Sequence, residues 1–223
     1  MIFKLQAIRR ALPAATLLTC LAAGVAVNLT ACVPLMVSGA VMGTLVASDR
    51  RTSGAQLEDE GIDLRSASRL REALGDRGHI NINSYNRQVL LTGEVPTAQD
   101  KETAEQIVSK VDNVRSIVNE IAVLGNSTLG QRSSDSLVTA KVKAGLVDAK
   151  DLFAGAFKVV TERGTTYMLG KVSQREADRA AEVARAVGGV QKVVRIFELI
   201  SDDELKSLLP KPAPSESAKQ PGG

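Results

Sequence analysis

A segment of about 60 residues occurs twice in this chain, and this repeat limits the possible folds more than any other feature. Residues 80–93 align with residues 157–170 without a gap. In both stretches apolar and polar residues alternate on two arms, and the residues between the arms, 85–87 and 162–164, are typical of turns. Each stretch therefore predicts a β-hairpin, and the fold must contain two similar units.

Helical periodicity flanks both hairpins. After each hairpin, apolar residues recur at helical spacing, and the helix leads into a last strand at residues 114–123 and 190–200. Before each hairpin, an amphipathic helix is expected to begin with Asp63 or Asp135 as its N-cap. Each unit then has the order helix, strand, strand, helix, strand, which predicts an α+β fold with helices covering a sheet.

This order resembles the BON domain, a module of bacterial envelope proteins. A glycine followed two residues later by a valine comes after each hairpin, at 93–95 and 170–172, as in that family. The resemblance implies two tandem BON domains, each with a three-stranded mixed sheet packed on two helices. We expect BON domain 1 at 63–124, a linker at 125–134, BON domain 2 at 135–200 and a disordered tail at 201–223, with a short helix through Leu209 at its start.

The amino-terminus has the three-part form of a secretory signal. Basic residues precede an apolar stretch at 11–27, and Leu29-Thr30-Ala31-Cys32 closes it. This ending resembles the bacterial lipobox. The resemblance implies that the signal peptide, residues 1–31, is removed and that Cys32 is acylated. A transmembrane anchor or an ordinary secretory signal are the alternatives, because the apolar run approaches the about 20 residues that span a bilayer.

The residue after the lipobox indicates whether the protein is anchored in the inner or the outer membrane. Lipoproteins of the inner membrane commonly have Asp directly after the cysteine, and Val33 stands there in this chain. We therefore expect a lipid anchor in the outer membrane, with the protein facing the periplasm. Residues 32–62 combine an apolar leader with a polar stretch, and this composition predicts a tether.

Charge argues against a nucleic-acid partner. The whole chain carries a net charge of +3, from 28 basic and 25 acidic residues, but the signal holds Lys4, Arg9 and Arg10 and no acidic residue. The mature chain therefore has 28 − 3 = 25 basic and 25 acidic residues. A neutral chain provides no overall basic field to attract phosphate backbones.

Few residues are suited to catalysis or to a metal. His79 is the only histidine, Cys20 leaves with the signal, and acylation consumes the thiol of Cys32. Triads, cysteine–histidine pairs and multi-histidine metal sites are therefore excluded, and a phosphate-binding loop is absent from the sequence. We expect a protein that is not an enzyme and has no cofactor.

Comparing the two copies points to the first helix of copy two as a binding surface. Aligning Ser66, Leu70 and Leu74 with Val138, Val142 and Leu146 places three apolar residues of copy two toward its sheet. On the opposite face this alignment matches Arg65 with Leu137 and Glu72 with Ala144, and copy two is also the more basic copy. The predicted phospholipid-binding residues are Leu137, Lys141, Ala144, Lys143 and, from the following loop, Phe153.

The family resemblance extends to function. Two BON domains behind a lipobox resemble the dual-BON outer-membrane lipoproteins associated with cell division and envelope stress, which bind phospholipid. This implies a protein that binds anionic phospholipid through BON domain 2 and supports envelope integrity, with a role at the division site. The alternative is a scaffold module that contacts envelope proteins through the same apolar face, or through an open sheet edge, without binding lipid.

Overall fold

The computed structural model describes residues 49–208, so the predicted signal, Cys32 and the end of the tail lie outside the described residues. The first half contains α3 (Ser53–Leu74), β1 (His79–Tyr85), β2 (Gln88–Val95), α4 (Ala98–Ser109), β3 (Ser116–Asn119) and β4 (Ala122–Val123). The second half contains α5 (Leu129–Asp148), a 3-10 turn (Ala154–Ala156), β5 (Phe157–Glu162), β6 (Thr165–Val172), α6 (Gln174–Arg185), β7 (Lys192–Leu199) and α7 (Asp202–Leu208).

Both predicted hairpins are present, each in a mixed sheet. In the first, β1 runs antiparallel to β2, and β3 and β4 both pair parallel to β2. In the second, the strand order is β5-β6-β7, with β5 antiparallel and β7 parallel to β6. The predicted α+β class and the order of elements in each unit are therefore confirmed.

The last strand of copy one, expected to be continuous over residues 114–123, is divided in two. The side-chain Oδ1 of Asn119 accepts a hydrogen bond from the backbone N–H of Ile121 at 3.3 Å. Asparagine commonly makes such local turns, which compete with a strand ladder. The chain returns to β2 at Ala122, so β3 and β4 are two parts of one edge.

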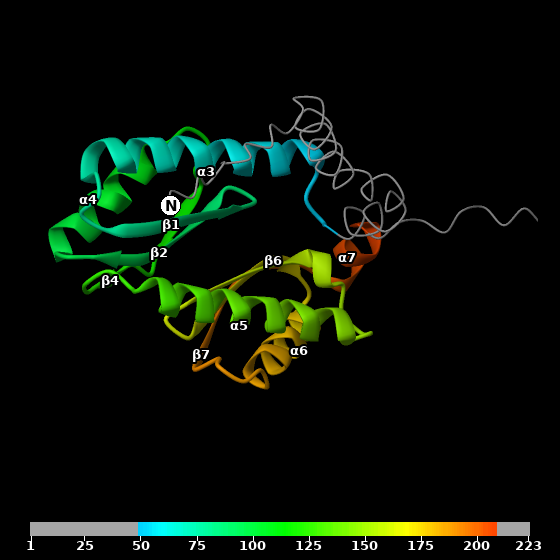
Figure 1. Ribbon diagram of the computed structural model, residues 1–223. Helices are drawn as coiled ribbons and strands as arrows, with labels where there is room; N and C mark the ends of the chain where they lie inside the picture. Colours follow the sequence, from blue (N-terminus) through cyan, green and yellow to red (C-terminus); the bar gives the residue numbers. More distant parts are fainter. Residues whose placement is uncertain (1–48, 209–223) are drawn as a thin grey trace, which may run out of the picture. The chain divides into compact units, whose positions relative to one another are not determined.

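Two apolar cores lie between helices and sheets, and Figure 1 shows α3 and α4 together on one side of β1 and β2. In copy one the core side chains of α3 are Ile62, Leu70 and Leu74. In copy two α5 contributes Val138, Val142 and Leu146, as the helical spacing predicts. A buried aliphatic side chain stabilises by about 1.5–3 kcal/mol, so these stripes fix which faces of α3 and α5 remain outside.

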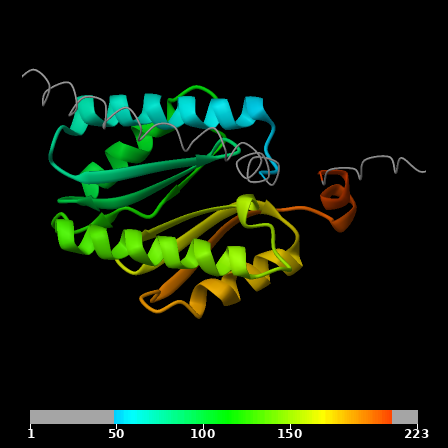
Figure 2. The ribbon, with the colours of Figure 1, turned by 45° about the vertical axis from the view of Figure 1, so that its right-hand side comes forward.

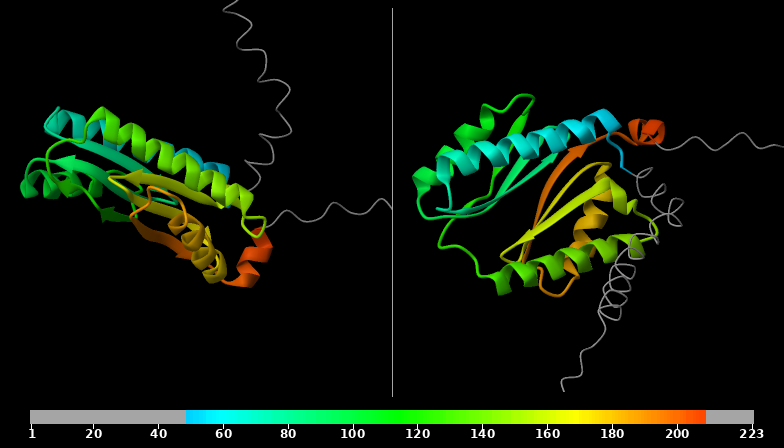
Figure 3. Two further views of the ribbon diagram at one scale, coloured as in Figure 1. Left: turned by 60° about the horizontal axis from the view of Figure 1, so that its bottom comes forward. Right: turned by 45° about the horizontal axis from the view of Figure 1, so that its top comes forward.

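A third apolar cluster joins the two copies through the opposite faces of their sheets. It consists of Tyr85 and Leu90 from the first sheet and Tyr167, Leu169 and Ile196 from the second. The Tyr85 hydroxyl also donates to the carbonyl of Ala156 at 3.4 Å. Figure 2 and the right view of Figure 3 show the two sheets adjacent, with the strands between α3 and α5. Both faces of each sheet are therefore covered.

Both first helices begin earlier than predicted. The N-caps are Thr52 and Thr128, whose hydroxyls accept from the backbone N–H groups of Ala55 and Gln131, so Asp63 and Asp135 lie inside helices. The predicted tether at 32–62 is therefore helical from Ser53 onward, and the predicted linker at 125–134 is largely the start of α5.

Buried aspartates explain these longer helices. The carboxylate of Asp59 accepts from the backbone N–H groups of Asn86 and Arg87 at 2.7 and 2.8 Å. In copy two, Asp135 accepts in the same way from Arg163 and Gly164 at 2.8 and 3.0 Å. Each aspartate thus binds a hairpin tip, where the backbone has positive φ and its N–H groups point toward the helix. This contact lies in the second turn of each helix and stabilises an amino-terminal part that has few apolar residues.

Two arginines before α3 fasten the chain to both copies. Arg50 pairs with Glu176 of α6 through two hydrogen bonds of 2.7 and 2.8 Å, and its Nη1 donates to the Lys171 carbonyl at 2.9 Å. Arg51 pairs with Asp59 at 2.7 Å and lies over the ring of Tyr85. We call Arg50, Arg51, Asp59 and Glu176 the arginine clasp.

The tail predicted as disordered from residue 201 contains a short helix, as expected for its beginning. α7 covers Asp202–Leu208, and Ser201 caps it by accepting from the N–H of Glu204 at 3.2 Å. Glu204 pairs with Lys171 of β6 at 2.7 Å. Residues 209–223 lie outside the described part.

Candidate lipid-binding face

α5 is a long helix with one face left outside the core. Thr128 and Gln131 form a capping box at its start, and Val138, Val142 and Leu146 are turned into the core of copy two. Successive residues of a helix are rotated by about 100°. The side chains half a turn away from this core stripe must therefore face outward.

The predicted site residues of α5 lie on or beside this outward face. Leu137 is 64% exposed, and Lys141, Lys143 and Ala144 are also exposed. Large apolar side chains that stay exposed together indicate an interaction surface. The face thus has the composition expected of a helix that lies in a membrane interface.

The outward face is longer than the sequence predicted. Ala140 is exposed between Leu137 and Ala144, and Val147, at 63% exposure, continues the row. Leu129 at the other end of the helix is 80% exposed. Leu129 and Val147 were missed because α5 was expected to span residues 135–146, whereas Ala140 lies within that range and was not included in the predicted site. The helical spacing of residues 137, 140, 144 and 147 in the sequence could have shown that they share one face. We call Leu137, Ala140, Ala144 and Val147 the α5 apolar face.

Two lysines border the α5 apolar face on opposite sides. At about 100° per residue, Lys141 and Lys143 lie roughly 160° apart, with the apolar row between them. The lysine ion pairs of the described residues involve Lys158, Lys171 and Lys206, but neither of these two. Both ammonium groups can therefore reach a charged surface while the apolar row contacts its interior. Asp148 is exposed one turn beyond Ala144 and opposes this at the end of the helix.

Phe153 lies after α5, in the loop before β5. Its side chain is 47% exposed, and the Arg50 guanidinium lies 5.8 Å from its ring centroid. Arg50 is held by Glu176. Phe153 is therefore close to the described start of the chain, which leads toward Cys32. The structure does not include it in the helical row formed by the other predicted residues.

The structure corrects how the copies are matched. The N-caps, the hairpin-binding aspartates and the buried stripes coincide when Thr52 is matched with Thr128 and Asp59 with Asp135. Leu137 then corresponds to Gly61, not to Arg65, which corresponds to Lys141 and pairs with Glu58 at 2.7 Å. The earlier matching was one helical turn out, because it relied on apolar spacing alone, which repeats every turn.

With the corrected matching, α3 and α5 differ in the charge of their outer faces. α3 also exposes leucines, with Leu57 and Leu64 at 75% and 71%. Its residues matching Ser136 and Thr139 are Glu60 and Asp63. Glu60 is exposed, whereas Asp63 is partly buried and pairs with Lys158 at 3.5 Å. Of these two positions, α3 therefore presents one exposed negative charge where α5 has a hydroxyl group, and that charge would repel an anionic surface.

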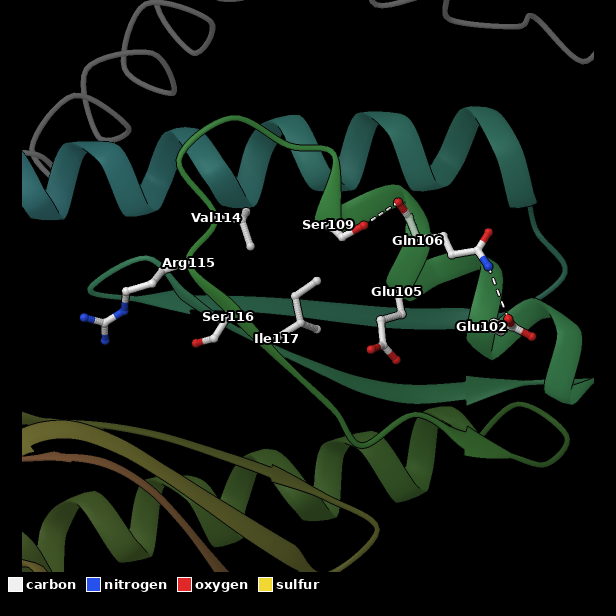
Figure 4. A pocket seen from close by; sticks show the side chains of 8 residues that line it. All are labelled: Glu102, Glu105, Gln106, Ser109, Val114, Arg115, Ser116 and Ile117. Atoms are coloured by element: carbon white, nitrogen blue, oxygen red, sulfur yellow. Dashed lines mark hydrogen bonds between the residues drawn. The ribbon is translucent and has the colours of Figure 1, made fainter.

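A separate hollow lies beside β3 of copy one. It has a volume of about 510 Å³, and Figure 4 shows Glu102, Glu105 and Gln106 of α4 on one wall and Arg115 and Ile117 on the other. Gln106 donates to Glu102 at 3.2 Å. Its charged side chains come from an exposed helix face and a strand edge. It shares no residue with the predicted site and brings no reactive group together.

The described residues contain no group of three or more His, Cys, Asp or Glu side chains placed to hold a metal ion. Between residues 49 and 208, none of the helices has the length and hydropathy needed to cross a membrane.

Comparison with known proteins places both halves in one family. The BON domain profile matches residues 62–125 and 134–199. The chain is 32% identical over 179 residues to "Outer membrane lipoprotein DolP" of Haemophilus influenzae, covering 79% of this chain and 93% of that protein. It is 37% identical over 154 residues to "21 kDa hemolysin" of Actinobacillus pleuropneumoniae, covering 68% and 79% respectively.

A more distant relative is "Osmotically-inducible protein Y" of Escherichia coli, 26% identical over 159 residues, which cover 68% of this chain and 77% of that protein. The profile matches both repeats, and the two nearer relatives align over most of their own length. The chain therefore belongs to the BON-domain family, as a member with two BON domains in tandem.

Proposed function

We propose that the protein is an outer-membrane lipoprotein, anchored through Cys32 and facing the periplasm, that binds anionic phospholipid through α5 of its second BON domain. The lipobox at residues 29–32 and the name of the Haemophilus relative support the anchor and the membrane. The observation that carries the lipid-binding role is the α5 apolar face, exposed between Lys141 and Lys143.

Energy estimates agree with binding that depends on the anchor. Burial of Leu137 in the acyl boundary contributes about 1.5–3 kcal/mol, and each lysine near an anionic surface contributes about 1 kcal/mol. These terms give only weak binding from solution. Asp49 comes 17 positions after Cys32 in the sequence, a span of at most about 60 Å. The anchor therefore keeps α5 at a high effective concentration near the membrane.

Vesicle flotation of the mature chain carrying Cys32→Ser tests the proposal, because this variant has no acyl group. Because binding without the anchor is weak, the assay uses a high lipid concentration. Under these conditions we expect the variant to float with vesicles of phosphatidylglycerol and phosphatidylcholine, to float less at high salt, and not to float with phosphatidylcholine alone. Leu137→Glu should weaken binding more than tenfold, since it removes the leucine term and adds a repelled charge.

Leu64→Glu is the matched control. Leu64 is as exposed as Leu137 and lies on α3 at the position that corresponds to Ala140. This control should bind vesicles like the parent protein. Equal losses from both substitutions, or unchanged flotation of Leu137→Glu, would refute the site and favour the envelope scaffold. Unaltered melting temperatures would show that neither change disturbs the fold.

The cellular part of the proposal is support of envelope integrity, including a role at the division site. A strain without the protein should become sensitive to detergents, and the wild-type gene should restore resistance. Leu137→Glu should fail to restore it although it is acylated and located like the wild type. Restoration by this variant would separate envelope integrity from lipid binding.

A further inference from the structure

The hollow beside β3 is a groove along the free edge of the first sheet. β3 ends the strand order β1-β2-β3, and within residues 49–208 no strand pairs with its other side. Ser116 and Ile117 of β3 form one wall of the groove, and α4 forms the other (Figure 4). A free sheet edge can bind an extended segment as an additional strand, and the neighbouring surface then selects among its side chains.

Alternate residues of β3 direct their backbone groups to this edge. The N–H of Glu120 donates to a carbonyl of β2 at 2.9 Å. Because successive residues of a strand point their backbone groups to opposite sides, Val118 and Ser116 also point toward β2, whereas Ile117 and Asn119 point away from it. No turn or loop hydrogen bond between residues 49 and 208 uses these outward groups. The edge therefore offers free donors and acceptors.

The α4 wall of the groove carries negative charge. Glu102 and Glu105 are exposed, and their hydrogen bonds come from neutral side-chain amides, at 3.2 and 2.9 Å. Among the ion pairs of residues 49–208, none includes either glutamate. Arg115 lies at the other end of the groove (Figure 4) and pairs with Glu198 of β7 at 3.4 Å. Two carboxylates thus face the edge strand without a cation.

Copy two differs at the corresponding edge. With the N-caps of α4 and α6 matched, Glu102 corresponds to Asp178. With the last strands matched by their register, Asn119 corresponds to Arg195. Arg195 of β7 pairs with Asp178 of α6 at 2.7 Å, so copy two neutralises this carboxylate itself. Charged side chains on an edge strand also discourage pairing with another strand, and β3 has none.

We propose that the groove between α4 and β3 binds an extended, basic segment of another protein, which joins the first sheet as an outer strand. Every second side chain of this segment would face α4. Lysine or arginine suits these positions, because the aliphatic stem can cover Ile117 while the charged end reaches Glu102 or Glu105. β3 has four residues, so the backbone can contribute few hydrogen bonds and the charged contacts are needed as well.

The test uses the mature chain carrying Cys32→Ser and the blocked peptide Lys-Val-Lys-Val-Lys-Val. The peptide should shift the NMR amide signals of Ile117 and Asn119 and slow their hydrogen exchange, because their N–H groups enter a ladder. The corresponding amides of copy two, Val193 and Arg195, are the internal control and should not respond. The peptide Lys-Lys-Lys-Val-Val-Val has the same charge without the alternation and should bind more weakly.

Two further changes separate the charged contacts from the backbone pairing. Glu102→Gln should weaken binding about threefold to fivefold, as expected for one exposed ion pair. Asp178→Asn, at the corresponding position of copy two, is the matched control and should leave binding unchanged. Methylating alternate backbone nitrogens of the peptide should abolish binding for the set that faces β3 and have little effect for the other set.

Several results would overturn the proposal. These are equal binding of the two peptides, equal losses from Glu102→Gln and Asp178→Asn, or equal effects of the two methylated sets. Peptide binding that appears only after deletion of residues 209–223 would assign the groove to the tail of this chain. Protection of Ile117 that rises with protein concentration, without peptide, would assign it to a second copy. Glu102→Gln should still float with vesicles like its parent, so this test is independent of lipid binding through α5.

Discussion

Removing Arg50 should destabilise both BON domains together, because its partner is a buried carboxylate. The side chains of Arg50 and Glu176 are 4% and 1% exposed, and two hydrogen bonds of 2.7 and 2.8 Å join them. Arg50→Ala leaves Glu176 charged and buried with only its capping contact to Ser173, at 3.0 Å. Breaking one side of such a pair costs about 3–5 kcal/mol.

The dependence of stability on pH provides the sharper test. Burial acts to raise the pKa of Glu176, but hydrogen bonds from Arg50 and Ser173 outweigh it and hold the pKa below its ordinary value of 4.5. A carboxyl group with a lowered pKa in the folded state stabilises the protein above its unfolded pKa, and this contribution is lost as the pH falls through the folded pKa. In Arg50→Ala, burial still raises the pKa of Glu176, but the hydrogen bonds from Arg50 that lower it are lost. The pKa should rise, and stability should increase as the pH falls from 7 toward 5.

Urea unfolding of the Cys32→Ser protein measures both effects. At pH 7 a loss of about 3–5 kcal/mol corresponds to a fall in melting temperature of about 6–20 °C for a unit of this size. Glu176→Gln, with Arg50 kept, is the companion variant and should reduce the dependence of stability on pH near 4.5 and below, although Asp59, whose pKa is also lowered, keeps its own contribution. A loss under 1 kcal/mol for Arg50→Ala, with the pH dependence of the wild type retained, would refute the reasoning.

Three further predictions concern the anchor, the hairpins and the domains. Cys32→Ser should move the protein from the membrane to the soluble envelope fraction, and pelleting with outer membrane in high salt would contradict lipid anchoring. Asp135→Ala should cost about 1–3 kcal/mol in urea unfolding, because two amides lose their acceptor, and a loss as large from Ser133→Ala would contradict this. Residues 126–200 should fold alone but less stably than in the whole chain, since Tyr167 and Leu169 become exposed, and the lack of a cooperative melt would show that the copies depend on each other.

The sequence predicted the units of this fold better than their boundaries. Alternation and turn residues placed both hairpins within one or two residues of β1–β2 and β5–β6. The N-cap of α3 is Thr52, eleven residues before the expected Asp63, because residues 53–61 contain few apolar side chains and resemble a tether. Their helix is stabilised instead by Asp59, which binds the distant hairpin tip. Such a contact leaves no periodic pattern.

The packing of the two sheets against each other was also missed. A strand with one covered face alternates strictly, and that pattern was assumed for both hairpins. Leu90 directly follows Val89, and Tyr167, Met168 and Leu169 are consecutive, so apolar side chains point to both faces. These runs were the available signal that both faces of each sheet are buried.

The position of the arginine clasp relates the anchor to the candidate face. Residues 49–51 are the first described residues of the chain and follow the leader. Arg50 lies against Phe153, just beyond the end of α5, and is held there by Glu176. The chain therefore enters the described part beside Phe153, in the loop that follows α5. If the clasp held residue 50 at another place, the anchored protein could turn either α3 or α5 toward the membrane. Because the clasp also binds Asp59 of copy one through Arg51, it fixes this approach relative to both BON domains. The orientation of the anchored domains thus depends on these four charged side chains, and weakening the clasp should reduce lipid binding even though no clasp residue belongs to the α5 apolar face.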